Sequence, residues 1–515
     1  MVAAGDRTHG WTTPHFFVTM VASAVSPSLE LSMRAQTLLF LALWCLVLRL
    51  PGWAQSSTAL DRVPQIPYTR FTLPNGMRVI LSEDHTLPVV TESMIFDVGG
   101  RQEHPGRSGF AHLFEHLMFE GSKDAPKGVF DHLVEGYGGS DNASTHTDYT
   151  FYYETVPSNA LPILMWLDAD RLASLNVTET NMKNQISVVE EEKRMRVDNQ
   201  PYGPLLYVDL GASAFSNWQN AHPVIGSFKD LDAATLNDVK AFFDAYYAPR
   251  NGILTIVGDI DPVKTEAMVR EYFGWIPNRG VIHPVNTREP EQTKEKQVVV
   301  HDAHANLPAL AIAWQGPPRN NKDYYALAVM GELLFSGTSS RLYQSLVKQQ
   351  QVAIDVEGGL GFPEANFVDY RSPGLFGGFV VQKAGSRITP DLVEQLIFRE
   401  IHEIEANGVS DEELTRAKTK IAAEWVRGQQ TTLERARRLA IAGLMDGNPE
   451  TANTLLDMLL RVRSDDIQQA AARYLNHARV TVVVDQPGAA PPVKATVATH
   501  LPATSPQATR KEKTR

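Results

Sequence analysis

The chain has 515 residues, of which 43% are hydrophobic and 21% charged, a composition typical of a globular protein with about two to four domains. Lys and Arg number 48 against 59 Asp and Glu, and the formal charge of −11 disfavours nucleic acid and anionic membranes as general partners. Cys45 is the single cysteine, which excludes a disulfide framework and leaves histidines and carboxylates to hold any metal ion.

The N-terminal segment predicts export from the cytoplasm. An apolar run at residues 37–48 follows Met33 and precedes the small residues Gly52 and Ala54, which is the pattern of a signal peptide cleaved before Gln55. The run is shorter than the roughly 20 residues that span a bilayer, so we expect no stable membrane insertion, with an uncleaved anchor as the alternative. Translation starts at Met1 or Met33, and we expect a periplasmic location.

A short, largely buried helix is predicted at residues 109–119, beginning after Ser108, because apolar residues recur there with helical spacing. Side chains four residues apart share a helix face, so His112 and His116 can direct two imidazole nitrogens at one ion, with Glu115 beside them as a base. The alternative is three polar residues that merely interrupt a helix. However, ionisable groups in an apolar helix are costly without a partner. The motif therefore predicts a zinc site.

Glu192 is the candidate for the third protein ligand that a catalytic zinc ion needs. It lies on a predicted helix and follows Gln185 by seven residues, so its side chain can project from the edge of the buried face. The apolar face of this helix is formed by Met182, Ile186 and Val189.

The remaining pattern predicts a duplication. A helix followed by the strand at residues 253–259 is echoed by a helix and strand ending at residue 485, and a proline-rich polar segment lies between the two copies. We therefore expect an α+β protein of two duplicated domains. The predicted divisions are residues 1–54 (extension and signal peptide), 66–276 (zinc-binding domain), 277–296 (linker), 297–486 (homologous domain without metal) and 487–515 (disordered tail).

The run His112-x-x-Glu115-His116, followed by Glu192, resembles the inverted zinc motif of the pitrilysin family of metallopeptidases, the inverzincins. Other stretches are similar to this family along most of the chain: residues 139–145, 149–153, 198–203, 246–259 and 337–342. The resemblance implies two α/β-roll domains, each a mixed sheet with helices packed on it, which form half of a clamshell. It also implies one zinc ion held by His112, His116 and Glu192, with Glu115 as the general base.

Asn142 and Ala143 resemble part of the family's edge strand, onto which a peptide substrate adds as a further β-strand through main-chain hydrogen bonds. From the residues alone, an ordinary exposed strand is the preferred interpretation. The resemblance therefore supplies the prediction that Asn142 and Ala143 contact substrate.

Three positions depart from the family pattern. Members that act alone or as identical pairs carry an Arg and, seven residues later, a Tyr that stabilise the tetrahedral intermediate, whereas this chain has Val347 and Ile354. We therefore expect a heterodimer with a homologous subunit that lacks zinc and supplies the Arg/Tyr pair. Gln185 replaces a Glu found in many relatives, so an accessory acid is absent while zinc binding is retained.

The resemblance implies a zinc endopeptidase that hydrolyses peptides or unfolded polypeptides enclosed in a chamber. Two alternatives stay open, namely a non-catalytic scaffold subunit and a specialised precursor-processing peptidase. The complete ligand set of His112, His116 and Glu192 disfavours the scaffold.

Overall fold

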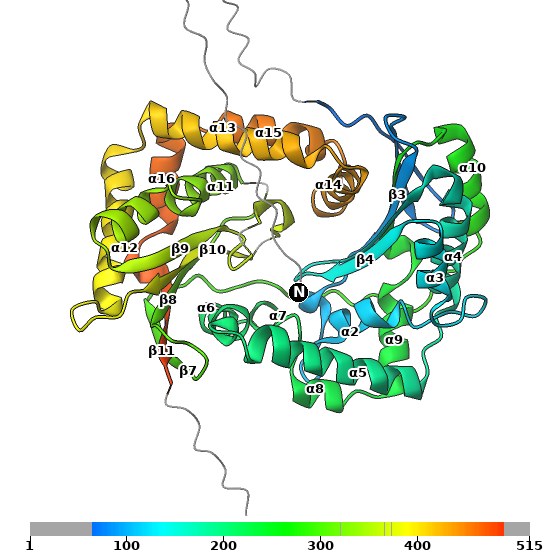
Figure 1. Ribbon diagram of the computed structural model, residues 1–515, viewed down its shortest axis with the longest axis horizontal. Coiled ribbons are helices and arrows are strands. Elements are labelled where there is room, and N and C mark those ends of the chain that lie inside the picture. Colours follow the sequence, from blue (N-terminus) through cyan, green and yellow to red (C-terminus); the bar gives the residue numbers. More distant parts are fainter. Residues whose placement is uncertain (1–63, 320, 365, 372, 489–515) are drawn as a thin grey trace, which may run out of the picture. The chain divides into compact units, whose positions relative to one another are not determined.

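Two β-sheets follow one another along the chain (Figure 1). The computed structural model describes residues 64–488 apart from residues 320, 365 and 372, so the predicted signal peptide and almost all of the predicted tail lie outside the described residues. The first sheet contains β1 (Thr69–Thr72), β2 (Arg78–Glu83), β3 (Val89–Phe96), β4 (Ser140–Thr145), β5 (Thr150–Pro157) and β6 (Gly252–Gly258). The second contains β7 (Lys296–Asp302), β8 (Ala309–Gln315), β9 (Ala353–Leu360), β10 (Leu375–Gln382) and β11 (Val480–Pro487).

Most helices of the described chain occur in two runs, one between β5 and β6 and the other between β10 and β11. The helices in the first half are α2 (Phe110–Leu117), α3 (Val129–Gly136), α4 (Leu161–Ser174), α5 (Glu179–Lys193), α6 (Leu210–Ala214), α7 (Trp218–Ala221), α8 (Phe228–Asp232), α9 (Leu236–Tyr246) and α10 (Pro262–Phe273). Those in the second half are α11 (Lys322–Phe335), α12 (Pro390–Asn407), α13 (Asp411–Gly428), α14 (Thr432–Met445), α15 (Thr451–Leu460) and α16 (Ser464–Tyr474). Among the described residues, no helix combines the length and the apolar character needed to cross a membrane.

The strand orders confirm the predicted duplication. The first sheet has the order β1-β2-β6-β3-β5-β4 and the second has the order β7-β11-β8-β10-β9. Apart from β1, each strand of the first sheet has a counterpart in the second: β2, β6, β3, β5 and β4 correspond to β7, β11, β8, β10 and β9 in that order. Strands that are neighbours in one sheet therefore correspond to neighbours in the other. In each sheet one pair is parallel, β2 with β6 and β7 with β11, and the other pairs are antiparallel. Both halves are therefore mixed sheets with the same topology.

One face of each sheet is covered by a helix from the other half of the chain. The face of the first sheet that carries Ile80, Ile95 and Ile253 packs on α14, which contributes Leu439 and Ala440 to the same buried cluster. Reciprocally, α6 and the helical turn Leu205–Asp209 pack on the second sheet beside Ala311, Phe379 and Val483. The opposite face of the first sheet is buried by its own helices, including α2, α4 and α10. Hydrophobic burial, the main stabilising term in folding, thus joins the two halves into one unit.

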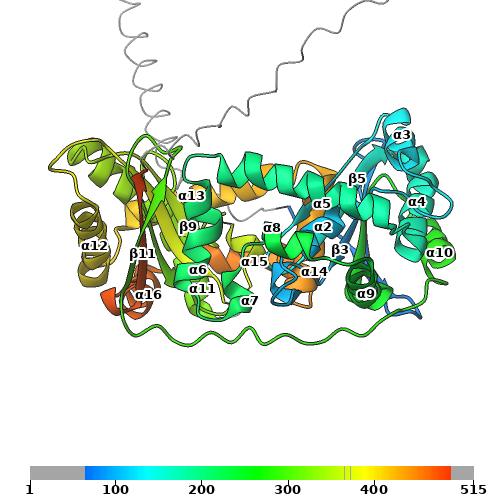
Figure 2. The same ribbon diagram turned by 90° about the horizontal axis from the view of Figure 1, so that it is seen from below.

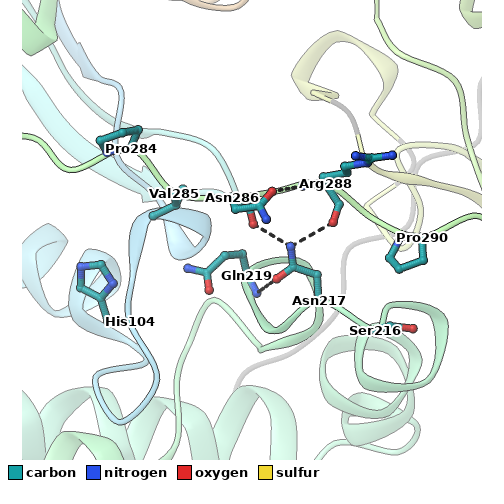
Figure 3. A pocket seen from close by; sticks show the side chains of 9 residues that line it. All are labelled: His104, Ser216, Asn217, Gln219, Pro284, Val285, Asn286, Arg288 and Pro290. Atoms are coloured by element: carbon teal, nitrogen blue, oxygen red, sulfur yellow. Dashed lines mark hydrogen bonds between the residues drawn. The ribbon is translucent and has the colours of Figure 1, made fainter.

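The connection between the halves contains neither helix nor strand from residue 277 to residue 295, and it can be followed in Figure 2. It is nevertheless held by specific contacts. Asn217 Nδ2 donates to the backbone oxygens of Asn286 and Arg288, and the Glu289 carboxylate accepts from the N–H groups of Ser216 and Asn217. Part of this contact borders a shallow pocket of about 470 Å³ (Figure 3). The domain boundaries near residues 276 and 297 stay a prediction, because the two halves share their cores.

A group of charged side chains is buried beside the first sheet. Glu92 on β3 lies directly opposite Glu154 on β5, and Asp168 and Arg171 approach from α4. The Arg171 guanidinium contacts Glu154 and Asp168, each at 2.6 Å. One cation therefore faces three carboxylates. Burial, followed by the charges of Asp168 and Glu154, raises the pKa of Glu92 well above its ordinary value.

We expect Glu92→Gln to stabilise the protein at alkaline pH. A carboxyl whose pKa is raised by folding contributes stability that is complete below the unfolded-state pKa of about 4.3 and is lost as the pH rises through the folded-state pKa. The substitution removes this loss, so the free energy of unfolding should rise by about 1–4 kcal/mol at alkaline pH and depend less on pH. Urea unfolding between pH 5 and 9 measures this, with exposed Glu266→Gln as the control. Equal pH slopes for the protein and Glu92→Gln would contradict the prediction.

Candidate metal centre

The N-terminus of α2 is set by a buried carboxylate. The sequence predicts a helix beginning after Ser108, and the structure gives Gly109 as the residue before the first turn, with a φ of 89° that favours glycine. The Ser108 hydroxyl donates to Asp230 instead of capping the helix. The carboxylate of Glu103 accepts hydrogen bonds from the N–H groups of Gly109 and Ala111, at 2.9 and 2.8 Å. A negative group at this end satisfies free N–H groups and complements the helix dipole.

His222 holds Glu103 in place. Its Nε2 lies 3.0 Å from Glu103 Oε2, and its Nδ1 lies 2.7 Å from the carbonyl oxygen of Trp218, whose ring stacks on the imidazole. Because a carbonyl oxygen only accepts, Nδ1 carries the proton of that bond. Burial opposes a charge on His222, but the hydrogen bond to Glu103 raises the pKa of His222 above its ordinary value. The pair fixes the helix that carries the predicted ligands.

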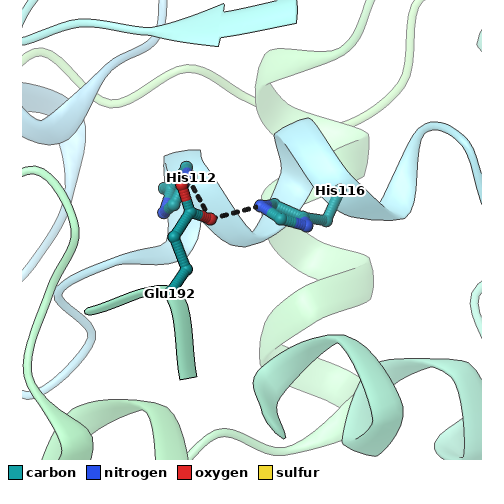
Figure 4. Close-up of side chains that lie close together, drawn as sticks. All are labelled: His112, His116 and Glu192. Atoms are coloured by element: carbon teal, nitrogen blue, oxygen red, sulfur yellow. Dashed lines mark ion pairs between the residues drawn. The ribbon is translucent and has the colours of Figure 1, made fainter. Parts of the chain in front are cut away.

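His112, His116 and Glu192 come together, as Figure 4 shows. Glu192 Oε2 lies 3.5 Å from His112 Nε2 and 3.2 Å from His116 Nε2. Ligands about 2.1 Å from a tetrahedral zinc ion lie about 3.4 Å apart, so Glu192 Oε2 already has the spacing that zinc requires from both imidazole nitrogens. The two histidines come from one face of α2, and the glutamate comes from the last turn of α5, which packs against α2. The donor set fits a zinc ion.

The charge states of His112 and Glu192 also suit a cation. Burial lowers the pKa of His112, which favours the neutral imidazole. The hydrogen bond from His116 holds the pKa of Glu192 below its ordinary value. Glu192 Oε1 is paired with Arg196 at 3.0 Å, which leaves Oε2 directed at the histidines. Neutral imidazoles and an ionised carboxylate are the forms that bind metal ions.

Glu115 lies between α2 and β4. The Thr145 hydroxyl at the end of β4 donates to Glu115 Oε2 at 2.5 Å. Within the described residues Oε1 makes no hydrogen bond, so it is the oxygen available to accept a proton. Thr145 was not predicted from the sequence, because only the packing of α2 on β4 brings it to Glu115.

Asn142 and Ala143 lie on β4, the edge strand of the first sheet. Their strand pairs with β5 on one side only, in a register that sets Asn142 opposite Tyr153 and Ala143 opposite Tyr152. The Asn142 side chain is exposed, and its Oδ1 accepts a hydrogen bond from the Ala143 N–H at 2.8 Å. An incoming peptide strand that pairs with Ala143 would have to displace this side chain.

Gln185 joins α5 to the end of α2. Its Nε2 donates to Glu120 Oε1 at 2.5 Å, and the same oxygen accepts from Lys127 Nζ at 2.6 Å. Glu120 is four residues beyond His116, and Gln185 is seven residues before Glu192. The contact between Gln185 and Glu120 therefore joins the same two segments of the chain as the contact between His116 and Glu192. Both side chains are buried.

We expect Gln185→Glu, which introduces the carboxylate found in many relatives, to destabilise this chain. The new carboxylate would face that of Glu120 with Lys127 Nζ, already paired with Glu120, as the donor they share, at a cost of about 1–3 kcal/mol. The exchanged pair, Gln185→Glu with Glu120→Gln, restores one donor and one acceptor and should recover most of that loss. Urea unfolding of the two single variants and the double variant forms the cycle. Additive losses in the double variant would show that the two side chains do not interact.

The second half of the chain does not repeat the metal ligands. When Phe119-Glu120-Gly121 is matched to Phe335-Ser336-Gly337, the positions of the two histidines correspond to Ala328 and Glu332. Helix α11, which carries them, is almost entirely buried. Val347 is half-buried in the helical turn Tyr343–Gln349, and Ile354 is 48% exposed on edge strand β9.

Comparison with known proteins gives the family. A family model described as "Insulinase (Peptidase family M16)" matches residues 78–226, and one described as "Peptidase M16 inactive domain" matches residues 233–421. The chain belongs to peptidase family M16, the pitrilysin family, as the resemblance of its zinc motif implies.

Individual relatives agree with this assignment. The chain is 33% identical over 285 residues to the zinc protease PqqE of Helicobacter pylori, a match that covers 55% of this chain and 64% of that protein. It is 24% identical to the uncharacterized zinc protease SCO5738 of Streptomyces coelicolor, over 79% of this chain and 87% of the relative. Among solved structures, a protease from Helicobacter pylori superposes with a TM-score of 0.76 at 26% identity, covering 82% of this chain and 100% of that one. The two-sheet fold is therefore the fold of M16-type peptidases.

Proposed function

We propose that this protein is a zinc endopeptidase. The observation that carries the proposal is that Glu192 Oε2 lies at zinc spacing from both His112 Nε2 and His116 Nε2, with Glu115 on the helix that carries the histidines. The membership of family M16 and the relatives named zinc proteases support it. We further propose one ion at this centre.

The roles of the chain's own residues follow from their positions. A zinc ion held here supplies a Lewis acid that polarises a peptide carbonyl and acidifies water. Glu115 Oε1 accepts the proton of the attacking water and passes it to the leaving amine, while the Thr145 hydroxyl holds the carboxylate through Oε2. Asn142 and Ala143 on β4 bind the substrate as an added strand, so that the main chain, more than the side chains, is recognised.

Zinc dependence tests the proposal directly. The purified protein should contain zinc, lose cleavage of a quenched peptide after chelation and regain it when zinc is returned. His112→Ala should lose both the ion and the activity, because it removes one ligand from the set. His104→Ala, which alters an imidazole outside the cluster, is the control. Peptide cleavage that persists without metal would refute the proposal.

We also propose a heterodimer in the periplasm. The support for a partner is the apolar pair Val347 and Ile354, where an Arg/Tyr pair is expected in members that act alone. The support for export is the apolar run at residues 37–48, which lies outside the described residues. Homologous subunits without zinc are the expected partners, and peptides are the expected substrates.

The partner proposal predicts a gain of function. Introducing Val347→Arg with Ile354→Tyr should raise peptidase activity of the isolated chain at least about tenfold, because donors for the developing oxyanion are added. Ile354 is exposed and has room for a larger side chain. Val426→Arg with Met458→Tyr, at two other partly exposed positions, is the control. Full activity of the unmodified isolated chain would contradict the heterodimer.

A further inference from the structure

A second cluster of metal-ligating side chains lies in the other half of the chain. Glu295, Glu394 and His477 each place one ligand atom within 4.8 Å of the others. Glu295 immediately precedes β7, Glu394 is in the first turns of α12, and His477 begins the turn His477–Arg479 that leads into β11. None of these residues belongs to the centre formed by α2 and α5.

The backbone brings two of these segments together. Strands β7 and β11 pair in parallel, with Lys296 beside Thr481, so Glu295 and His477 both lie at the start of this pair. The imidazole of His477 stacks on Phe398, at an angle of 18° between the rings. Phe398 follows Glu394 by four residues and lies on the same face of α12. Stacking on Phe398 thus holds His477 beside Glu394.

Glu394 is a buried acid without a partner. Its side chain is in the packed face of α12, the residue is only 8% exposed, and no hydrogen bond or ion pair from the described residues reaches it. The carboxylate oxygens of Glu394 are not among the fully buried unpaired atoms, so they keep the solvent access through which a metal ion can reach them.

The local field favours a cation. The charged groups that act on Glu394, Glu295 and Asp391, are both negative. Lys296, the nearest cation in sequence, directs its ammonium to the backbone oxygens of Ser213 and Ala214. The negative charge of the cluster is therefore not balanced by that lysine.

We propose that Glu295, Glu394 and His477 bind a divalent transition-metal ion that ties α12 to the start of the β7–β11 pair. An imidazole with two carboxylates suits zinc and its neighbours better than calcium or magnesium, which prefer oxygen ligands alone. Ligands on a tetrahedral zinc ion lie about 3.4 Å apart, so ligand atoms within 4.8 Å of one another need to approach by at most about 1.4 Å to complete the site. Three protein ligands leave the remaining positions for water.

Counting zinc in the full chain tests this inference independently of the first centre. After removal of metal and dialysis against excess zinc, the protein should hold two ions per chain. Glu394→Gln, which keeps the shape of the side chain, and His112→Ala, which affects the first centre, should each hold one, and the double variant none. Glu403→Gln, an exposed glutamate on the same helix, should retain two. If the second site binds zinc but the centre formed by α2 and α5 does not, the protein should hold one ion per chain and Glu394→Gln should hold none.

A second readout covers variants that bind weakly. In the His112→Ala background, zinc should raise the unfolding temperature because it binds the remaining site. Adding His477→Ala should weaken the zinc affinity of that site by more than about 100-fold. Residues that only support metal ligands contribute about 10–100-fold to metal affinity, so loss of a ligand itself should cost more. Circular dichroism confirms that each variant is folded. Equal zinc counts for the protein, Glu394→Gln and Glu403→Gln would overturn the proposal, as would a zinc-dependent unfolding temperature that is unchanged by His477→Ala.

Discussion

Glu115→Gln should retain zinc and lose peptidase activity by a factor of about 10²–10⁴, the usual contribution of a general base. Gln has the shape of Glu and still accepts the hydrogen bond of Thr145, so α2 and the positions of His112 and His116 should not change. It cannot take a proton from water. Zinc content and the cleavage rate of a quenched peptide, measured on the same preparation together with its partner, provide the test.

A matched control separates loss of the base from loss of charge near the site. Glu191→Gln removes one negative charge from α5 next to Glu192, and Glu191 is exposed and paired with Arg194. This control should retain both zinc and activity. An active Glu115→Gln variant would remove Glu115 from the proposed mechanism, and loss of zinc in that variant would assign it a structural role instead.

The second large effect is expected from separating the two halves of the chain. A fragment of residues 64–285 should not fold alone, because it lacks α14 and would expose the sheet face formed by Ile80, Ile95 and Ile253. Co-expression with residues 286–488 should restore a folded complex, since each fragment supplies the helix that covers the sheet of the other. Circular dichroism and co-purification measure this. A cooperatively folded 64–285 fragment would contradict the exchange of helices.

A single substitution measures the same interface in the intact chain. Leu439 on α14 is fully buried against the first sheet, so Leu439→Ala should lower the free energy of unfolding by about 2–5 kcal/mol. Met458→Ala, at a 40% exposed position on α15, should cost much less. Urea unfolding compares the two. Equal losses would show that the packing of α14 on the first sheet contributes little.

Local patterns predicted much of the fold correctly. The strand expected at residues 253–259 is β6, within one residue at each end. Helix α13 begins with a capping box formed by Ser410 and Glu413, whose spacing is visible in the sequence. These features depend on periodicity and on hydrogen bonds between near neighbours, which a sequence displays directly. The start of α2 was predicted less well, because its cap, Glu103, lies outside the helix and is identified only by contact.

The sequence by itself determined the candidate ligands His112, His116 and Glu192 and the candidate base Glu115, since helical spacing places the histidines together and the motif resembles that of one peptidase family. The tertiary structure alone decided three other matters: the exchange of α6 and α14 between the sheets, the support of α2 by Glu103 and His222, and the meeting of Glu295, Glu394 and His477. Each depends on contacts between segments far apart in the chain. No local pattern records such contacts, because hydrophobic burial and charge pairing act on distance in space and not on separation in sequence.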